Sequence, residues 1–206
     1  MQCLICNKVI EETFNSLFSD SNRVCYKCLT QFKNRNEHFM IANVEGYVLY
    51  YYDDFFRDLL YRYKGCYDYV LKDAFFHHNL NMIRRKYRGY SIVLAPSNES
   101  SERERGFNHL NEIFENLKMP IIKCFKKTKE WKQSDKKIVQ RKNIQNVIKI
   151  DKKELEGVKK VLLVDDVLTS GATIKTMIRQ MPTNIDKKVL VLSSNSDFLS
   201  NESVKK

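Results

Sequence analysis

The sequence has 206 residues, of which 43% are hydrophobic and 30% charged, and this balance predicts a globular chain of one ordinary domain with a small appendage. Its 36 Lys and Arg residues exceed its 25 Asp and Glu residues, so the net charge is +11 and polyanions are the expected partners. No run approaches 18 apolar residues, and the N-terminus lacks the basic and apolar regions of a signal peptide. We therefore predict a cytoplasmic protein without a transmembrane segment.

Two Cys-x-x-Cys pairs near the N-terminus predict a metal site. Each pair turns two thiolates toward one ion, and their separation is typical of a structural zinc site. Disulfides are the alternative, which the lack of a secretory signal disfavours. Four thiolates leave no open position for catalysis. The predicted Zn2+ ligands are Cys3, Cys6, Cys25 and Cys28. We place a zinc module at residues 1–36 and the main domain at residues 37–206.

The next stretch predicts a link, a strand and two helices. Residues 37–46 are expected to link the module to the main domain, and the β-branched and aromatic run at residues 47–52 predicts a strand. Asp53 is placed to cap a helix that ends near Gly65. A second helix is expected over residues 67–87. The two remaining cysteines, Cys66 and Cys124, are expected to be buried apolar residues.

A second buried strand is predicted at residues 91–95, followed by a polar loop with clustered arginines and a helix that begins after Asn108. A strand, a polar loop and arginines in this order suit the binding of an anion. The candidate contacts are Pro96, Ser97, Arg103 and Arg105.

A basic segment follows, in which nine basic and two acidic residues lie between Lys123 and Lys142. Cations beside aromatic residues suit single-stranded nucleic acid, because bases stack on rings and lysines contact phosphates. A solvated loop is the alternative. The candidate nucleic-acid contacts are Lys126, Lys127, Lys129, Trp131 and Arg141.

The most informative stretch runs from Val161 to Thr173. Four apolar residues predict a strand buried on both faces, which ends in Asp165 and Asp166. A turn of small hydroxyl residues around Gly171 then leads into an amphipathic helix. Backbone N–H groups, hydroxyls and the helix dipole suit a phosphate, and the two carboxylates suit ribose hydroxyls. A merely structural turn is the alternative, while the six glycines fit neither a P-loop nor a dinucleotide-binding turn.

This stretch resembles the phosphoribosyl-pyrophosphate (PRPP) signature of type I phosphoribosyltransferases. The resemblance implies an α/β domain of the type I phosphoribosyltransferase-like fold, with a mostly parallel sheet, behind the four-cysteine module. It also implies that the ribose hydroxyls bind the catalytic pair Asp165 and Asp166. The 5'-phosphate would bind Thr169, Ser170, Gly171, Ala172 and Thr173. The strands that end at Ala95 and Asp165 should meet at one edge, so that both anion-binding loops share a crevice.

A narrower resemblance covers nearly the whole chain. The four cysteines, Tyr63-Lys64-Gly65, the segment from Ser97 to Asn108, Arg141-Lys142-Asn143-Ile144 and the PRPP signature are similar, in this order, to the competence protein F family. One departure is His109, which stands where Gln is usual.

The resemblance implies a cytoplasmic DNA-uptake protein that handles incoming single-stranded DNA, alongside a competence helicase, and binds PRPP or a related phosphosugar. The alternative is an active phosphoribosyltransferase with an unknown nitrogen acceptor. In that case Mg2+ would bridge pyrophosphate and the ribose hydroxyls, while the basic loop would close over PRPP. Pyrophosphate would then bind the Pro96–Ser97 turn with help from Arg103 or Arg105.

Overall fold

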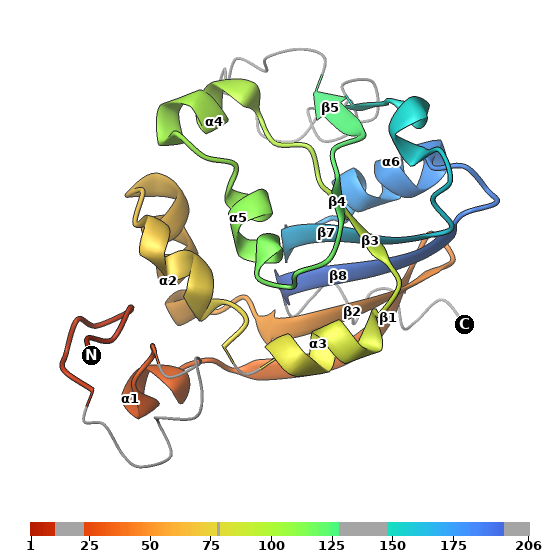
Figure 1. Cartoon of the computed structure of the whole chain (residues 1–206). Helices are drawn as coiled ribbons and strands as arrows, with labels where there is room; N and C mark the ends of the chain where they lie inside the picture. Colours follow the sequence, from red (N-terminus) through yellow and green to blue (C-terminus); the bar gives the residue numbers. More distant parts are fainter. Residues whose placement is uncertain (11–22, 78, 128–147, 196–206) are drawn as a thin grey trace.

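The computed structural model describes residues 1–10, 23–77, 79–127 and 148–195. Its centre is a six-stranded sheet with the strand order β1-β2-β8-β7-β3-β4 (Figure 1). β1 and β2 are antiparallel, and every other neighbouring pair is parallel. A mostly parallel sheet with helices, behind a four-cysteine segment, confirms the predicted fold class.

The sheet consists of β1 (Asn34–Ile41), β2 (Val44–Tyr51), β3 (Ser91–Leu94), β4 (Ile121–Ile122), β7 (Lys160–Leu168) and β8 (Asp186–Ser194). A separate antiparallel pair consists of β5 (Phe125–Lys127) and β6 (Ile148–Ile150). The α-helices are α1 (Tyr26–Leu29), α2 (Asp54–Gly65), α3 (Leu80–Lys86), α4 (Glu99–Arg105), α5 (His109–Glu115) and α6 (Ala172–Gln180). Two 3-10 helices are η2 (Tyr69–Ala74) and η4 (Lys152–Leu155).

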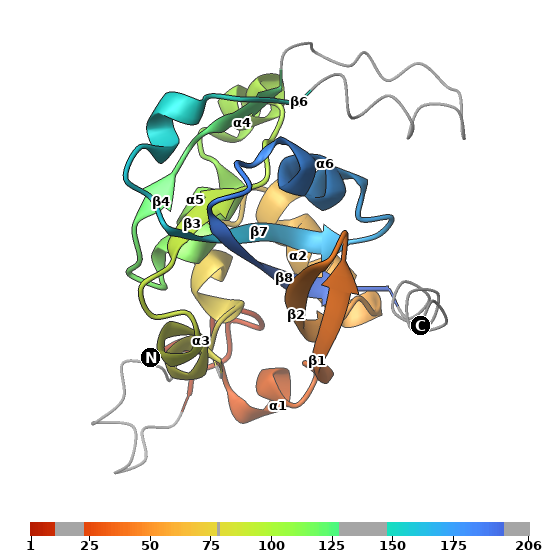
Figure 2. The same ribbon diagram turned by 90° about the vertical axis from the view of Figure 1, so that its right-hand side faces the viewer.

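β7 occupies the middle of the sheet, between β8 and β3, as its apolar run predicted. Its residues 161–164 are fully buried, because helices cover both faces of the sheet. α6 lies on one face, and α2, α3 and α5 lie on the other (Figure 1, Figure 2). This division follows from right-handed crossovers, since the connection from β7 to β8 crosses the sheet in the opposite direction to the one from β2 to β3.

The helix predicted after Asp53 is confirmed as α2. The Asp53 carboxylate accepts a hydrogen bond from the backbone N–H of Phe56 at 3.0 Å, which caps the helix as expected. Phe56, Leu59 and Tyr63 are buried on the face that α2 turns toward the sheet. The strand predicted just before this helix is also confirmed, as part of β2.

The predicted link over residues 37–46 is wrong. These residues contain most of β1 and the start of β2, which form an antiparallel hairpin at one edge of the sheet. The proposed division between residues 36 and 37 falls within β1, and the two-part domain organisation stays a prediction.

The single helix predicted over residues 67–87 is also wrong, because two separate helices replace it, η2, which ends at Ala74, and α3, which begins at Leu80. The buried Tyr50 hydroxyl donates to the Phe75 carbonyl at 3.1 Å, and the Asn79 amide donates to the Tyr50 hydroxyl at 3.0 Å. The hydroxyl therefore takes the Phe75 carbonyl, which a continuous helix would bond to the N–H of residue 79.

Two smaller differences concern the loop after β3 and the cysteines. Part of the expected polar loop forms α4, which Asn98 caps by accepting a hydrogen bond from the Ser100 N–H. Cys124 is buried as predicted, whereas Cys66 is exposed at the end of α2. Within the described residues, every helix is too short or too polar to cross a bilayer.

Candidate functional site

The crevice opens where β3 leaves β7. The Ala95 N–H donates to the Val164 carbonyl at 2.9 Å, and the chain then turns away at Pro96, which has no N–H to continue the ladder. β7 does not end at its carboxylates as predicted, because it stays paired with β8 as far as Leu168. Asp165 therefore lies beside the gap that β3 vacates, so the shared crevice predicted at this edge is present.

A cavity of about 230 Å³ lies at this gap. It brings together residues from β7, α2, α4, α5, α6 and β5, which are far apart in the sequence. Of the predicted site residues, it contains Pro96, Ser97, Arg105, Asp165, Asp166, Thr173 and Lys127. The other lining residues are Lys64, Ala95, Asn98, Ser101, His109 and Leu110. We call this cavity the pocket.

Asp166 is buried and ion-paired on the face that α2 and α5 cover. Its Oδ2 atom lies 2.6 Å from Lys64 Nζ and 3.1 Å from His109 Nε2. Burial alone would raise the pKa of this carboxyl, but the Lys64 ammonium and the His109 hydrogen bond outweigh it and hold the pKa below its usual range. Asp166 is therefore ionised across the physiological pH range.

Asp165 has a different environment, because successive side chains of a strand point to opposite faces. Its Oδ1 atom accepts a hydrogen bond from the Asp166 N–H at 2.9 Å. Burial and the nearby Asp166 charge raise the pKa of Asp165 to about 7. The acidic pair is therefore asymmetric, with one carboxylate fixed by cations and one that titrates near neutral pH.

Arg105 and Arg103 lie in different surroundings. Arg105 lines the pocket, and its Nε is buried without a hydrogen-bond partner among the described residues. A buried N–H donor without an acceptor is energetically costly, and a guanidinium that lines a cavity suits an oxyanion of a ligand. Arg103 does not line the pocket, because its side chain is 79% exposed and pairs with Glu99 at 3.4 Å.

The predicted phosphate turn joins β7 to α6. Thr169 and Ser170 are exposed, and Gly171 has a φ of +66°, a left-handed conformation that favours glycine. Ala172 and Thr173 begin α6, so their N–H groups lie at the positive end of a nine-residue helix. Of this turn, only Thr173 is among the residues that line the pocket.

A second cavity, of about 170 Å³, adjoins the pocket across Ala95, Pro96 and Ser97. Its walls carry Glu99, Glu102, Asn108, Lys123, Phe125, Lys126 and Lys127. Lys126 and Lys127 are exposed residues of β5. The other predicted nucleic-acid contacts, Lys129, Trp131 and Arg141, lie outside the described residues.

Sequence reasoning gave no role to Lys64 or His109, although both contact Asp166. Lys64 is 102 residues away from Asp166 in the chain, and no local pattern connects the two. The signals available for Lys64 were its place next to the buried face of α2, one residue after Tyr63, and the resemblance of Tyr63-Lys64-Gly65 to a segment of the competence protein F family. His109 stood out as a histidine directly after the helix cap Asn108 and as a departure from the Gln that is usual at this place in the family.

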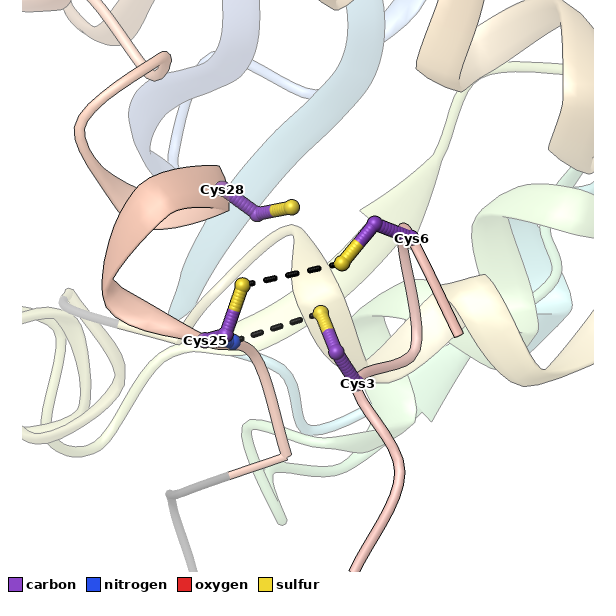
Figure 3. A group of neighbouring side chains, drawn as sticks. All are labelled: Cys3, Cys6, Cys25 and Cys28. Carbon is purple, nitrogen blue, oxygen red and sulfur yellow. Dashed lines mark hydrogen bonds between the residues drawn. The ribbon is translucent and has the colours of Figure 1, made fainter. Parts of the chain in front are cut away.

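The four predicted zinc ligands come together at the N-terminus (Figure 3). Their Sγ atoms all lie within 4.8 Å of one another, and the Cys25 N–H donates to Cys3 Sγ at 3.3 Å. Cys6 Sγ and Cys25 Sγ are 3.7 Å apart, close to the spacing of about 3.8 Å between thiolates that surround Zn2+ at about 2.3 Å. The residues fit a structural zinc ion.

The cysteine cluster also contacts α2. The Arg62 guanidinium donates to the carbonyl of Ile5, between the first two cysteines, at 2.8 Å. The same side chain pairs with Asp68 at 3.0 Å. The metal-binding loop is thus held against the last turn of the helix that carries Lys64.

We expect the purified chain to bind one Zn2+, and Cys6→Ser to abolish this binding because a tetrahedral thiolate site needs all four ligands. Chelation of the metal should lower the Tm by about 5 °C or more, since the binding free energy stabilises only the folded state. Metal analysis and thermal unfolding measure both effects. Cys66→Ser is the matched control, because Cys66 lies outside the cluster, and loss of zinc from this variant would contradict the assignment.

The acidic pair should respond in opposite ways to neutralisation. Asp166→Asn leaves Lys64 and His109 without their shared carboxylate, and should lower the free energy of unfolding by about 2 kcal/mol. Asp165→Asn should instead stabilise the chain above pH 7. The folded state holds the Asp165 proton up to a pKa of about 7, whereas the unfolded chain releases it at about pH 4. The free energy of unfolding of the wild type therefore falls as the pH rises from about 4 to about 7, and the neutral Asn avoids this loss.

Urea unfolding at several pH values measures both effects on the free energy of unfolding. A gain for Asp165→Asn that does not grow between about pH 4 and about pH 7 would refute the assignment of the raised pKa to this residue. Equal stability of Asp166→Asn and the wild type would show that the ion pair with Lys64 is not formed.

Two curated proteins are similar to this chain over most of its length. Competence protein ComFC of Streptococcus pneumoniae (strain ATCC BAA-255 / R6) is 26% identical, with 84% of this chain and 90% of that protein covered. Competence protein ComFC of Bacillus subtilis (strain 168) is also 26% identical, with coverage of 84% and 85%. No family model matches the sequence.

Solved structures that match this chain include a hypoxanthine phosphoribosyltransferase from Staphylococcus aureus, with a TM-score of 0.36, 11% identity and coverage of 57% of this chain and 59% of that chain. An adenine phosphoribosyltransferase from Leishmania tarentolae has a TM-score of 0.33 and 14% identity, with coverage of 63% and 73%. The similarity to the two ComFC proteins over most of both chains confirms the resemblance of this chain to the competence protein F family.

Proposed function

We propose that this chain is a cytoplasmic competence protein that handles incoming single-stranded DNA and binds PRPP, or a related phosphosugar, in the pocket. The competence role is supported by the similarity to the two ComFC proteins. The observation that supports the ligand proposal is the placement of the acidic pair, Arg105 and the start of α6 around one cavity. A helicase of the DNA-uptake machinery is the proposed protein partner.

The two charge types of the pocket match the two parts of a phosphosugar. Asp165 and Asp166 would accept hydrogen bonds from the ribose hydroxyls, while Thr173 and the turn before it would hold the 5'-phosphate. Arg105 and Lys127 would neutralise pyrophosphate beside the Pro96–Ser97 turn. Carboxylate and hydroxyl oxygens suit Mg2+, which would spread the pyrophosphate charge when bound with the ligand.

We expect PRPP with Mg2+ to bind the wild type in a calorimetric titration, and the Asp165→Asn/Asp166→Asn variant not to bind. The double variant removes both acceptors of the ribose hydroxyls. Asp165→Asn alone should also weaken binding, and it keeps the stabilising pair of Asp166 and Lys64. Asp54→Asn is the control, because its carboxylate is 92% exposed on α2 and far along the helix from Lys64. Absence of binding by the folded wild type would refute the phosphosugar proposal.

We expect alanine replacement of Lys126, Lys127, Lys129, Trp131 and Arg141 to weaken binding of an oligo-dT strand by at least tenfold at moderate salt. The slope of log affinity against log salt concentration should also become shallower by about 3, because each of the four lost cations contributes about 0.7 to it through one phosphate contact. Fluorescence anisotropy measures both quantities.

The control for this prediction removes four exposed cations elsewhere, at Arg88, Lys152, Lys153 and Lys159, and so keeps the net charge equal. If both variants lose affinity for DNA by the same factor, then the affinity depends on the total charge of the protein, and the basic segment is not the specific binding surface.

A second candidate function is an active phosphoribosyltransferase with a nitrogen acceptor. The adjoining cavity favours it, because the two cavities share the Ala95–Ser97 turn. Glu102 in its wall is a carboxylate that accepts from N–H donors. Release of pyrophosphate from PRPP in the presence of an amine or a nucleobase would support this activity.

A further inference from the structure

His109 connects two sides of the pocket that the proposed function assigns to different parts of the ligand. It is the first residue of α5 and is only 6% exposed. Its Nε2 lies 3.1 Å from Asp166 Oδ2, and its Nδ1 lies 3.4 Å from Arg105 Nη2. The Tyr63 hydroxyl donates to the His109 carbonyl at 2.9 Å, so the backbone of the residue is held as well.

The neighbours of the ring determine its tautomer. A guanidinium is always a donor, so Nδ1 has to accept the hydrogen bond from Arg105. The proton of a neutral imidazole is then on Nε2, from which it is donated to the Asp166 carboxylate. The two contacts require the neutral ring, because a protonated Nδ1–H would face the guanidinium with a second donor.

We propose that His109 is a positioning residue, whose neutral Nε2–H tautomer ties Arg105 to Asp166 and so holds the ribose-binding and pyrophosphate-binding groups in one geometry. The identity of the ligand rests on the proposed function. His109 and Lys64 both contact Oδ2 of Asp166, which is one of the residues that line the pocket. On the other side, the Nη2 contact orients the guanidinium whose buried Nε lacks a partner.

The arrangement makes the pocket sensitive to acid. Among the described residues, the charged and titratable groups that line the pocket with His109 or contact it are Asp165 and Asp166 from β7, Lys64 and Tyr63 from α2, Arg105 from α4 and Lys127 from β5. Burial lowers the pKa of His109, and the Asp166 charge only partly offsets it. The neutral ring therefore persists at neutral pH, and ligand affinity should fall as the pH drops below about 6.5.

Two substitutions separate the hydrogen bonds of His109 from its titration. The amide of His109→Gln can accept from Arg105 and donate to Asp166, but it has no pKa in this range. His109→Leu fills similar space and makes neither hydrogen bond. The probe is PRPP with Mg2+, titrated by calorimetry at about pH 7.5 and at about pH 5.5.

At about pH 7.5, His109→Gln should bind within about threefold of the wild type, and His109→Leu about tenfold more weakly. At about pH 5.5, the wild type should lose more affinity than His109→Gln. Protonation of the ligand phosphate, with a pKa near about 6, and of Asp165 affects both proteins equally, so their difference isolates His109. Wild-type affinity in His109→Leu, a loss in His109→Gln as large as in His109→Leu, or identical pH profiles would overturn the proposal.

A measurement without ligand separates this proposal from the proposed function. The chain has four histidines, and the 15N signals of His109 are those that disappear in His109→Gln. We expect the Nε2–H tautomer at neutral pH and a titration midpoint below about 6.5. A Nδ1–H tautomer would refute the positioning role even if PRPP binds. The expected tautomer in a wild type that fails to bind PRPP would refute the phosphosugar proposal and leave the link between Arg105 and Asp166 intact.

Discussion

The ion pair of Asp166 with Lys64 is the interaction on which the rest of the site depends. A buried carboxylate is costly unless a cation and hydrogen bonds compensate it, and this one obtains both from elements that lie far apart in the sequence. Lys64 comes from the last turn of α2 and His109 from the first turn of α5, so a single oxygen atom fixes the ends of two helices relative to the central strand. The Asp166 carbonyl is fixed too, since it accepts from Ser193 of β8 at 3.2 Å.

The same pair explains why the two neighbouring carboxylates differ. Because adjacent strand residues face opposite sides of the sheet, Asp165 has no comparable cation within hydrogen-bond distance among the described residues and retains its proton more readily. The proposed ligand, with its ribose hydroxyls, would meet one carboxylate that is already oriented and one whose charge state can change when the ligand binds. Arg105 lines the same cavity, so its walls carry a cation as well as the two carboxylates.

The sequence was informative wherever a feature depends on a few adjacent residues. The buried run of β7, the cap at Asp53 and the four cysteines follow from local patterns, and the structure has all three. It was misleading where a distant side chain decides the outcome. Tyr50 of β2 interrupts a helix that residues 67–87 alone would favour, and β1 occupies a stretch that resembles a link. Lys64 and His109 belong to the pocket only because the fold brings them to Asp166, which no spacing in the sequence records.

The last turn of α2 carries three consecutive side chains that contact three different parts of the chain. Arg62 contacts the carbonyl of Ile5 in the cysteine loop, Tyr63 contacts the backbone of α5, and Lys64 reaches Asp166. Successive residues of an α-helix are rotated by about 100° about the helix axis, so three consecutive side chains point in three different directions. The length of α2 is therefore fixed as strictly as its composition. Insertion or deletion of one residue before Arg62 would turn all three side chains away from their partners at once, although each residue would still be present.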